Sequence, residues 1–477
     1  MKPARQQGKV VDAEAAAQAL DRSALLLGGP IASTLLKLAA PTLVVVMMQA
    51  AINVIETYFV GRLGTEALAG VSLVFPLVML MTMMAAGGMG GAVASAVARA
   101  LGGGRRDEAE AILVHALIIA LALGVVFSIA AIVAAPGLYR AMGGAGGALN
   151  AAIRYSDTIF AGAVAFWVLN VLAAVLRGTG NMVFPALVSV AGAVVLIPLS
   201  PALILGWGPL PRLGVAGGAT ALVAYYAAGA AALLAHILLG RNVLRLHLRG
   251  IRLRAQIFGQ ILGVGAISSL MTVQSNLMVI VTTGLVGLFG TAALAGYGLA
   301  ARLDYLLIPP MFALGTAAVT MVGTNIGAGQ IARAERIAWV AAAIAFGVCA
   351  LIGVIVSIVP SAWLGLFSGD AAVLRFGGLY LRIVGPFYGF IGAALLLFFA
   401  SQGAGQMRWP FIGGLLRFVI VIVIGGSVVR VFGAGLPALF AVIAVSAVTF
   451  GTVNALGISS GAWRQLRTPS PVSLAGG

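Results

Sequence analysis

PTLVVVMMQAAINVIETYFVGRLG, residues 41–64, is an apolar run about as long as one membrane crossing, and it carries a single carboxylate, Glu56. Gln49, Asn53 and Glu56 are spaced i, i+4 and i+7, so a helix would place them on one face. A charged side chain at the centre of a bilayer costs roughly 2.5–3.5 kcal/mol. We therefore expect a transmembrane helix with a functional acid; the alternative is a polar stripe that only holds helices together.

The composition shows that this stretch is typical of the whole chain. Of 477 residues, 61% are hydrophobic and only 8% are charged, whereas about a quarter of the residues in a soluble domain are charged. The pattern predicts an all-α integral membrane protein with twelve transmembrane helices. We expect them at residues 38–60, 68–98, 111–135, 150–176, 182–206, 215–240, 257–286, 292–325, 337–360, 373–400, 409–431 and 437–461.

The basic residues gather in the loops that follow even-numbered spans, as around Arg105, Arg177 and Arg408. Because positive loops stay on the cytoplasmic side, both termini are expected there, and the net charge of +16 reflects topology rather than a nucleic-acid partner. Residues 1–30 have mixed charge and no continuous apolar core, so we interpret them as a cytoplasmic arm. The single cysteine, Cys349, and three dispersed histidines predict no disulfide and no metal site.

An internal repeat organises the spans. GTEALAG at 64–70 returns as GTAALAG at 290–296, 226 residues later, and GTGNM at 178–182 returns as GAGQM at 403–407, 225 residues later. Tyr155 and Tyr380 also match at an offset of 225. The repeat predicts two pseudo-symmetric six-helix lobes of the same orientation, at 31–240 and 257–462, joined by a basic cytoplasmic linker, 241–256, and followed by a cytoplasmic tail, 463–477. Two such lobes are typical of an alternating-access transporter.

The acidic residues are few enough to consider one by one. Of twelve Asp and Glu, only Glu56, Asp157 and Asp304 fall within the predicted spans. No hydrolytic dyad or nucleophile–His–acid pattern is present, so an enzyme is not expected. Asp157 follows Arg154 by three residues, which favours an ion pair. The alternative is a contact between the lobes, since the repeat counterpart of Asp157 is Arg382. Asp304 follows Arg302 by two residues, so each of these side chains is expected to reach another helix or the cleft between the lobes.

Several segments together resemble the multidrug and toxic compound extrusion (MATE) family: LKLAAPTLVVVMMQ, IETYFVGRLGTEALAGVSL, LRGTGNMVFPAL, GWGPLPRLGVAGGA and TMVGTNIGAGQ. The resemblance covers about residues 31–462. It implies a V-shaped, two-lobed exporter of organic cations and drugs that is driven by inward flow of protons or sodium.

The chain departs from the family's pattern at several acidic positions. Glu56 stands where the family usually has an Asp, just before T-x-x-x-G-R-L-G. Leu196 and Ser200 stand where many members have Asn and Asp, and the acids that sodium-coupled members often carry in spans 7 and 10 are absent. These departures leave Glu56 as the principal carrier and favour protons, because sodium binds through several hard oxygen ligands.

The sequence thus predicts a proton-coupled antiporter of a bacterial-type inner membrane, with sodium coupling less favoured. Proton and substrate would exclude each other at Glu56. We expect amphipathic cationic substrates, contacts with membrane lipids, no cofactor and a monomer. The residues expected to line the cleft are Gln49, Asn53, Asn170, Ser200, Gln274, Asn276, Arg302 and Asp304. The alternative is a flippase for a lipid-linked saccharide in the same superfamily, which Arg302, Arg382 and Arg417 keep open.

Overall fold

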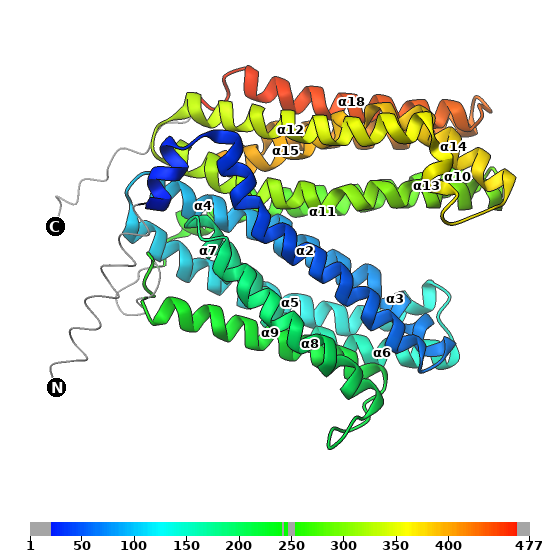
Figure 1. Ribbon diagram of the computed structural model, residues 1–477, viewed down its shortest axis with the longest axis horizontal. Coiled ribbons are helices and arrows are strands. Elements are labelled where there is room, and N and C mark those ends of the chain that lie inside the picture. Colours follow the sequence, from blue (N-terminus) through cyan, green and yellow to red (C-terminus); the bar gives the residue numbers. More distant parts are fainter. Residues whose placement is uncertain (1–20, 241–242, 247–252, 465–477) are drawn as a thin grey trace. The chain divides into compact units, whose positions relative to one another are not determined.

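The computed structural model describes residues 21–240, 243–246 and 253–464 (Figure 1). Most of the expected arm and tail, and half of the linker 241–256, lie outside these residues. The described part contains helices and no strand. The main helices are α2 (Ile31–Gly61), α3 (Thr65–Thr82), α4 (Gly90–Gly102), α5 (Arg106–Ala141), α6 (Gly146–Ala161), α7 (Ala163–Gly178), α8 (Val183–Leu205), α9 (Val215–Leu238), α10 (Ala255–Gly287), α11 (Thr291–Gly327), α12 (Ile331–Ile358), α13 (Pro360–Leu364), α14 (Ala371–Val384), α15 (Tyr388–Ala404), α16 (Arg408–Val419), α17 (Gly426–Arg430) and α18 (Leu436–Ser459).

The prediction of twelve spans is confirmed, with one span broken in two. Eleven described helices or helix runs are long and apolar enough to cross a membrane, and the pair α6–α7, bent by 48°, makes the twelfth. The sequence pattern predicts one helix at 150–176, whereas the structure breaks it at Gly162. Side-chain atoms of Val223 on α9 occupy the space that a Cβ on residue 162 would need, so α9 packs directly against the break.

Two spans contain a π-helical segment. The run Thr65–Gly102 is α3, the π-helix η1 (Met83–Met89) and α4. The run Arg408–Arg430 is α16, the π-helix η3 (Ile420–Gly425) and α17. A π turn holds one residue more than the α-helical path it replaces, and such turns are frequent at functional sites.

The backbone confirms the internal repeat. Glycines at matching positions of the two repeats share the left-handed conformation that residues with a Cβ rarely adopt. The matched pairs are Gly64 (φ 113°) and Gly290 (φ 99°), Gly104 (72°) and Gly329 (76°), and Gly180 (80°) and Gly405 (74°). The two halves of the chain therefore turn at equivalent points.

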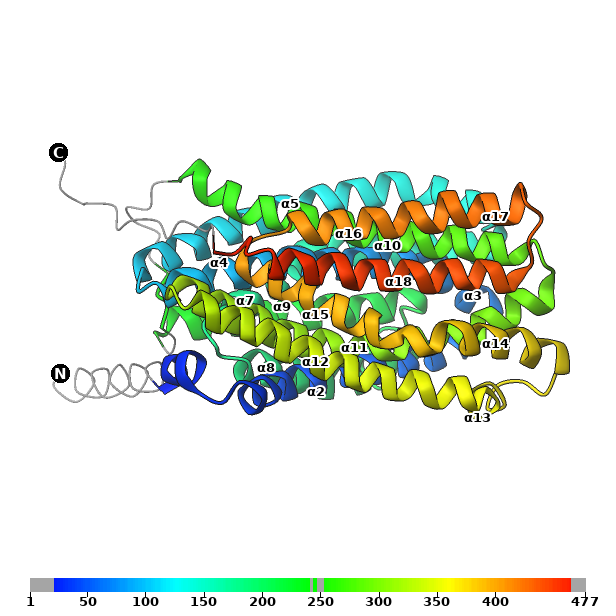
Figure 2. The same cartoon turned by 90° about the horizontal axis from the view of Figure 1, so that it is seen from above.

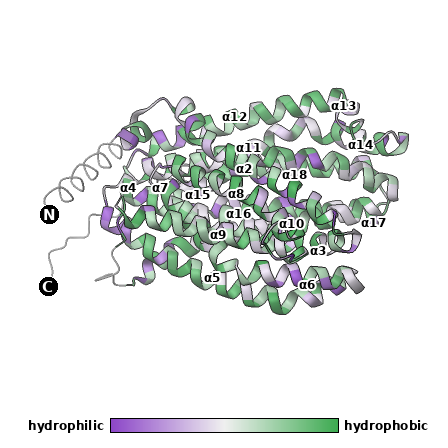
Figure 3. Cartoon of the chain, turned by 60° about the horizontal axis from the view of Figure 1, so that its bottom comes forward, coloured by the Kyte–Doolittle hydropathy of each residue, from purple (hydrophilic) through white to green (hydrophobic). Residues whose placement is uncertain are grey.

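The chain divides into two compact units, each described here by itself. Unit 1 comprises Met1–Gly29, Lys37–Val97 and Arg105–Ser269; unit 2 comprises Pro30–Leu36, Ala98–Gly104 and Leu270–Gly477. In unit 1, α9 packs against α6, α7 and α8. In unit 2, α15 packs against α11, α12 and α18 (Figure 2). Most residues along the helices of both units are hydrophobic, as expected for membrane spans (Figure 3).

Unit 2 includes the end of α4, which meets α11 at two matched glycines. A Cβ on Gly102 would lie 2.1 Å from the carbonyl oxygen of Thr324, and a Cβ on Gly327 would lie 2.0 Å from that of Arg99. The Arg99 guanidinium donates to the carbonyl of Gly403 (3.1 Å). Each contact needs a glycine, because a Cβ at residue 102 or 327 would collide with the backbone of the facing helix.

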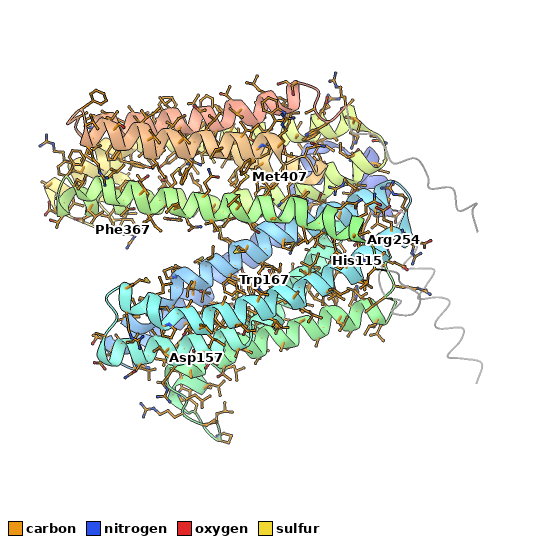
Figure 4. All side chains as sticks on the ribbon, turned by 180° about the vertical axis from the view of Figure 1, so that it is seen from behind. His115, Asp157, Trp167, Arg254, Phe367 and Met407 are labelled. Atoms are coloured by element: carbon orange, nitrogen blue, oxygen red, sulfur yellow. The ribbon has the colours of Figure 1, made fainter. Side chains whose placement is uncertain are left out.

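A buried histidine attaches the end of the linker to α5. His115 Nε2 accepts a hydrogen bond from the backbone N–H of Arg254 (2.9 Å), and Nδ1 donates to the carbonyl of Ala111 (2.7 Å), so the ring is held as one neutral tautomer (Figure 4). The Phe258 ring also lies against His115, with 4.7 Å between centroids.

Candidate functional site

Glu56 lies on the buried face of α2. Ile52, Glu56 and Val60, four residues apart, are 8%, 7% and 0% exposed, so one stripe of the helix faces the interior of unit 1. Ile52 packs with Leu196 of α8 and Ala221 of α9 in one apolar cluster. The carboxyl group therefore lies in the protein interior, held between apolar contacts one turn to either side.

Two residues fix the position of the carboxyl group. Tyr155 of α6, itself buried, donates its hydroxyl hydrogen to Glu56 Oε1 at 2.9 Å. Gly218 of α9 also adjoins it, because a Cβ there would stand 2.8 Å from the same oxygen. The carboxyl group is thus oriented by a hydroxyl on one helix and by the missing side chain on another.

A small pocket adjoins the carboxyl group. Its volume is about 10 Å³, close to the space that one water molecule requires. Glu56 and Ser200 are its polar lining, and Ile52, Leu196 and Leu222 contribute apolar walls. Ser200 Oγ is buried and finds no hydrogen-bond partner in the described part of the chain. Pro201 has no N–H to donate to the carbonyl of Ile197, another lining residue.

The charge of Glu56 is not balanced by a basic side chain. Within the described residues no Lys, Arg or His forms an ion pair with it. A buried carboxylate is strongly destabilised unless a proton or a cation neutralises its charge. The pocket has room for one such small species and not for a drug-sized molecule.

Unit 2 holds a second acid in a related but different way. Tyr380 of α14, the repeat partner of Tyr155, donates to Asp304 Oδ2 at 2.7 Å. Asp304 lies on α11, whereas the repeat position of Glu56 is Thr282 on α10. The matched tyrosines therefore bind acids on different helices. Unlike Glu56, Asp304 interacts electrostatically with a basic residue, Arg417 of α16.

The tyrosines and Gly218 contact the acids at the candidate sites, and sequence reasoning missed them. The matched offset of Tyr155 and Tyr380 was a signal, but it did not reveal which acid each would reach. Of the predicted residues, Ser200 does share a pocket with Glu56.

The other predicted residues are not gathered at Glu56. Gln49, Asn53 and Asn276 are exposed, whereas Asn170 and Gln274 are half-buried. The amide of Asn170 donates to the carbonyl of Phe166 on its own helix (2.9 Å), and Gln274 lines a separate pocket in unit 2.

The expectation for Arg302 and Asp304, that the two side chains reach elsewhere rather than pair with each other, agrees with the structure. Arg302 is exposed and lies over the Phe367 ring at 5.7 Å, and Asp304 accepts a hydrogen bond from Tyr380 of α14. Asp157 is also exposed, and the expected Arg154–Asp157 ion pair is absent from the described residues, so that prediction is wrong (Figure 4). Both side chains lie at the surface, where separate solvation competes with such a pair.

One protein-family model and several known transporters match the sequence of this chain. The MatE family model matches residues 41–202 and 268–425, more than half of the chain. The FAD transporter of Shewanella oneidensis is 26% identical over 397 residues, covering 83% of this chain and 87% of the relative. The probable multidrug resistance protein NorM of Deinococcus radiodurans is 28% identical over 412 residues, covering 81% and 86%.

Solved structures show the same architecture. A MATE crystal structure in the bent conformation superposes with a TM-score of 0.85 at 25% identity, covering 93% of this chain and 98% of that one. A MOP superfamily transporter from Pyrococcus furiosus gives a TM-score of 0.84, also at 25% identity and with the same coverage.

Proposed function

Because this chain belongs to the MatE family of multidrug and toxic compound extrusion transporters, we propose that it is a secondary antiporter that exports organic cations and drugs in exchange for protons. In this proposal it works in a bacterial-type inner membrane with both termini in the cytoplasm, and Glu56 couples the two fluxes. The supporting observation is a buried carboxyl group that has a tyrosine hydrogen bond, a pocket for one small species and, among the residues the structure describes, no basic partner.

The mechanism follows from the position of that carboxyl group. When Glu56 is ionised, its uncompensated negative charge favours the binding of a cationic substrate to unit 1. Protonation of Glu56 removes this charge, and the substrate is released. The Tyr155 hydroxyl serves both states, because it can donate to Oε1 whether or not the other oxygen carries a proton. Proton and cation thus compete for one group, which couples their movements in opposite directions.

The polar groups at the pocket favour a proton over sodium. Hard cations bind through sets of oxygen ligands. Here the side chains that line the pocket offer the Glu56 carboxylate and the Ser200 hydroxyl, and the other lining side chains are apolar. The hydroxyl of Tyr155 is hydrogen-bonded to Glu56, and Tyr226 interacts with Glu56 electrostatically. A proton needs only the carboxylate.

The decisive experiment uses proteoliposomes loaded with a fluorescent cation such as ethidium, with a proton gradient or a sodium gradient imposed separately. We expect the proton gradient alone to drive transport. Glu56→Gln should abolish it, whereas the matched control Asp157→Asn, an exposed acid of the same unit, should transport like wild type. Proton-driven transport by Glu56→Gln at the wild-type rate, or transport driven only by sodium, would contradict the proposal.

A further inference from the structure

Arg417 is a cation deep inside a membrane span. It lies nine residues after Arg408, where the span begins, which is about 13.5 Å along a helix and so near the middle of a hydrocarbon layer about 30 Å thick. Arginine at that depth costs roughly 2.5–3.5 kcal/mol, and such residues normally pair with an acid. In the described chain Arg417 forms no ion pair and no hydrogen bond, and its Nε is buried without a partner.

The surroundings of Arg417 form a pocket within unit 2. It has a volume of about 20 Å³, and its lining includes Met271, Gln274, Ser275, Gly414 and Phe450 around the guanidinium. The Phe450 ring lies 5.5 Å from Arg417 Cζ and stabilises the cation without satisfying its N–H groups. The acid that interacts with it electrostatically, Asp304, has one oxygen already bonded to Tyr380.

Helix packing in this fold does not require an arginine at that position. The repeat-related residue in unit 1 is Gly192, and the Tyr225 ring fills the space there, 2.5 Å from where a Cβ would stand. One repeat thus places an aromatic ring where the other places a charge. The π-helix η3 begins three residues after Arg417, a feature that often accompanies functional positions.

We propose that the Arg417 pocket binds the carboxylate or phosphate group of an amphipathic aromatic substrate. The inference rests on the proposed transport function and extends the substrates to organic anions and zwitterions. The planar guanidinium matches two oxygens of such a group, and the Gln274 amide and Ser275 hydroxyl provide further donors. A lipid headgroup offers the same chemistry, but the depth of Arg417 favours a substrate that enters the protein.

The test uses three ring-matched probes that differ only in charge: 2-naphthoate, 2-naphthalenemethanol and 2-naphthylmethylammonium. Their binding to the purified full chain in phosphatidylcholine nanodiscs is measured by calorimetry. We expect wild type to bind naphthoate more tightly than the alcohol. Arg417→Gln should weaken naphthoate binding roughly tenfold to a hundredfold, as expected for losing a charge-assisted hydrogen bond, and should leave the alcohol unchanged.

Two further variants keep the test decisive if Arg417→Gln does not fold. A Cβ at Gly414 would lie 3.2 Å from Met271 Cε and 3.3 Å from Gln274 Oε1, both ends of flexible side chains, so Gly414→Ala fills the pocket and should weaken naphthoate binding. Asp304→Asn removes the competing negative charge and should strengthen it. Folding is checked by the thermal midpoint and by a monodisperse elution profile.

The results distinguish a failure of the anion-binding proposal from a failure of the antiport function on which it rests. Equal binding of naphthoate and the alcohol by wild type, or unchanged naphthoate binding in folded Arg417→Gln and Gly414→Ala, overturns the inference. Loss of naphthoate binding when phosphatidylglycerol replaces phosphatidylcholine identifies a lipid headgroup as the occupant and also overturns it. Absence of proton-driven ethidium transport by wild type, with Arg417-dependent naphthoate binding intact, contradicts the antiport proposal alone.

Discussion

Gly218→Ala should lower the stability of the protein, because the new Cβ would clash with Oε1 of Glu56. The new Cβ would stand 2.8 Å from Glu56 Oε1, whereas ordinary contacts begin near 3.4 Å, so the carboxyl group must move by about 0.6 Å. The same oxygen accepts the Tyr155 hydrogen bond at 2.9 Å, and a displacement of that size disturbs a bond whose O···O distance is normally about 2.5–3.0 Å. Overpacking of this kind costs about 1–3 kcal/mol.

Two measurements would detect this change. Equilibrium unfolding in mixed micelles should show a loss of about 1–3 kcal/mol, and proton-driven ethidium transport should slow because Glu56 is displaced. Gly263→Ala is the matched control, since a Cβ at that helical glycine of unit 1 meets nothing within 4 Å. We expect this control to be neutral or up to about 1 kcal/mol more stable, because alanine favours helix.

A double-mutant cycle isolates the contact. In a Glu56→Ala background there is no carboxyl group to displace, and the next neighbour, Ile204 Cδ1, would lie at an ordinary 3.5 Å. Gly218→Ala should then be close to neutral for stability. If it destabilises that background as much as the wild type, the carboxyl contact is not the cause, and the reasoning is refuted.

Three other predictions concern single sites. Gly102→Ala places a Cβ against the backbone of Thr324 and should destabilise by about 3 kcal/mol or more in thermal or chemical unfolding; the control Gly104→Ala has open space and should lose only about 1–2 kcal/mol through its left-handed backbone. Ser200→Ala removes a hydroxyl without a partner in the described chain and should stabilise by roughly 1 kcal/mol while proton-driven ethidium transport persists; lost transport would show that the hydroxyl binds the coupling ion. His115→Ala leaves the Arg254 N–H unpaired and opens a cavity, so its thermal midpoint should fall by the equivalent of about 2–4 kcal/mol; an unchanged midpoint would contradict that role.

Much of the fold was predictable because it depends on local features of the sequence. Spans follow from apolar runs, and the two halves follow from glycine turns such as Gly64 and Gly290, whose backbone conformation restricts the choice of residue. The bend at Gly162 was not predicted, because the residue packed against it, Val223, lies on another helix and local spacing does not reveal it.

The site was predictable only in part. Glu56 was identified because an acid in an apolar span is expensive wherever its partners lie. Its orientation depends on Tyr155 and Gly218, which reach it from α6 and α9, and spacing along α2 carries no information about either. Helical spacing predicts that Asn53 shares a face with Glu56. It cannot predict that Asn53 is exposed whereas Glu56 is buried.

The π-helix η1 has a consequence for how the two halves diverged. Gly64 and Gly102 are 38 positions apart, whereas their partners Gly290 and Gly327 are 37 apart. The extra residue falls in the span that contains η1, and the corresponding helix α11 is uninterrupted. A π turn is what a helix forms when one residue is inserted and both ends stay fixed. The change of offset from 226 to 225 thus corresponds to one extra residue that the π-helix Met83–Met89 accommodates, and deleting one residue there should restore an unbroken α-helix without moving either matched glycine.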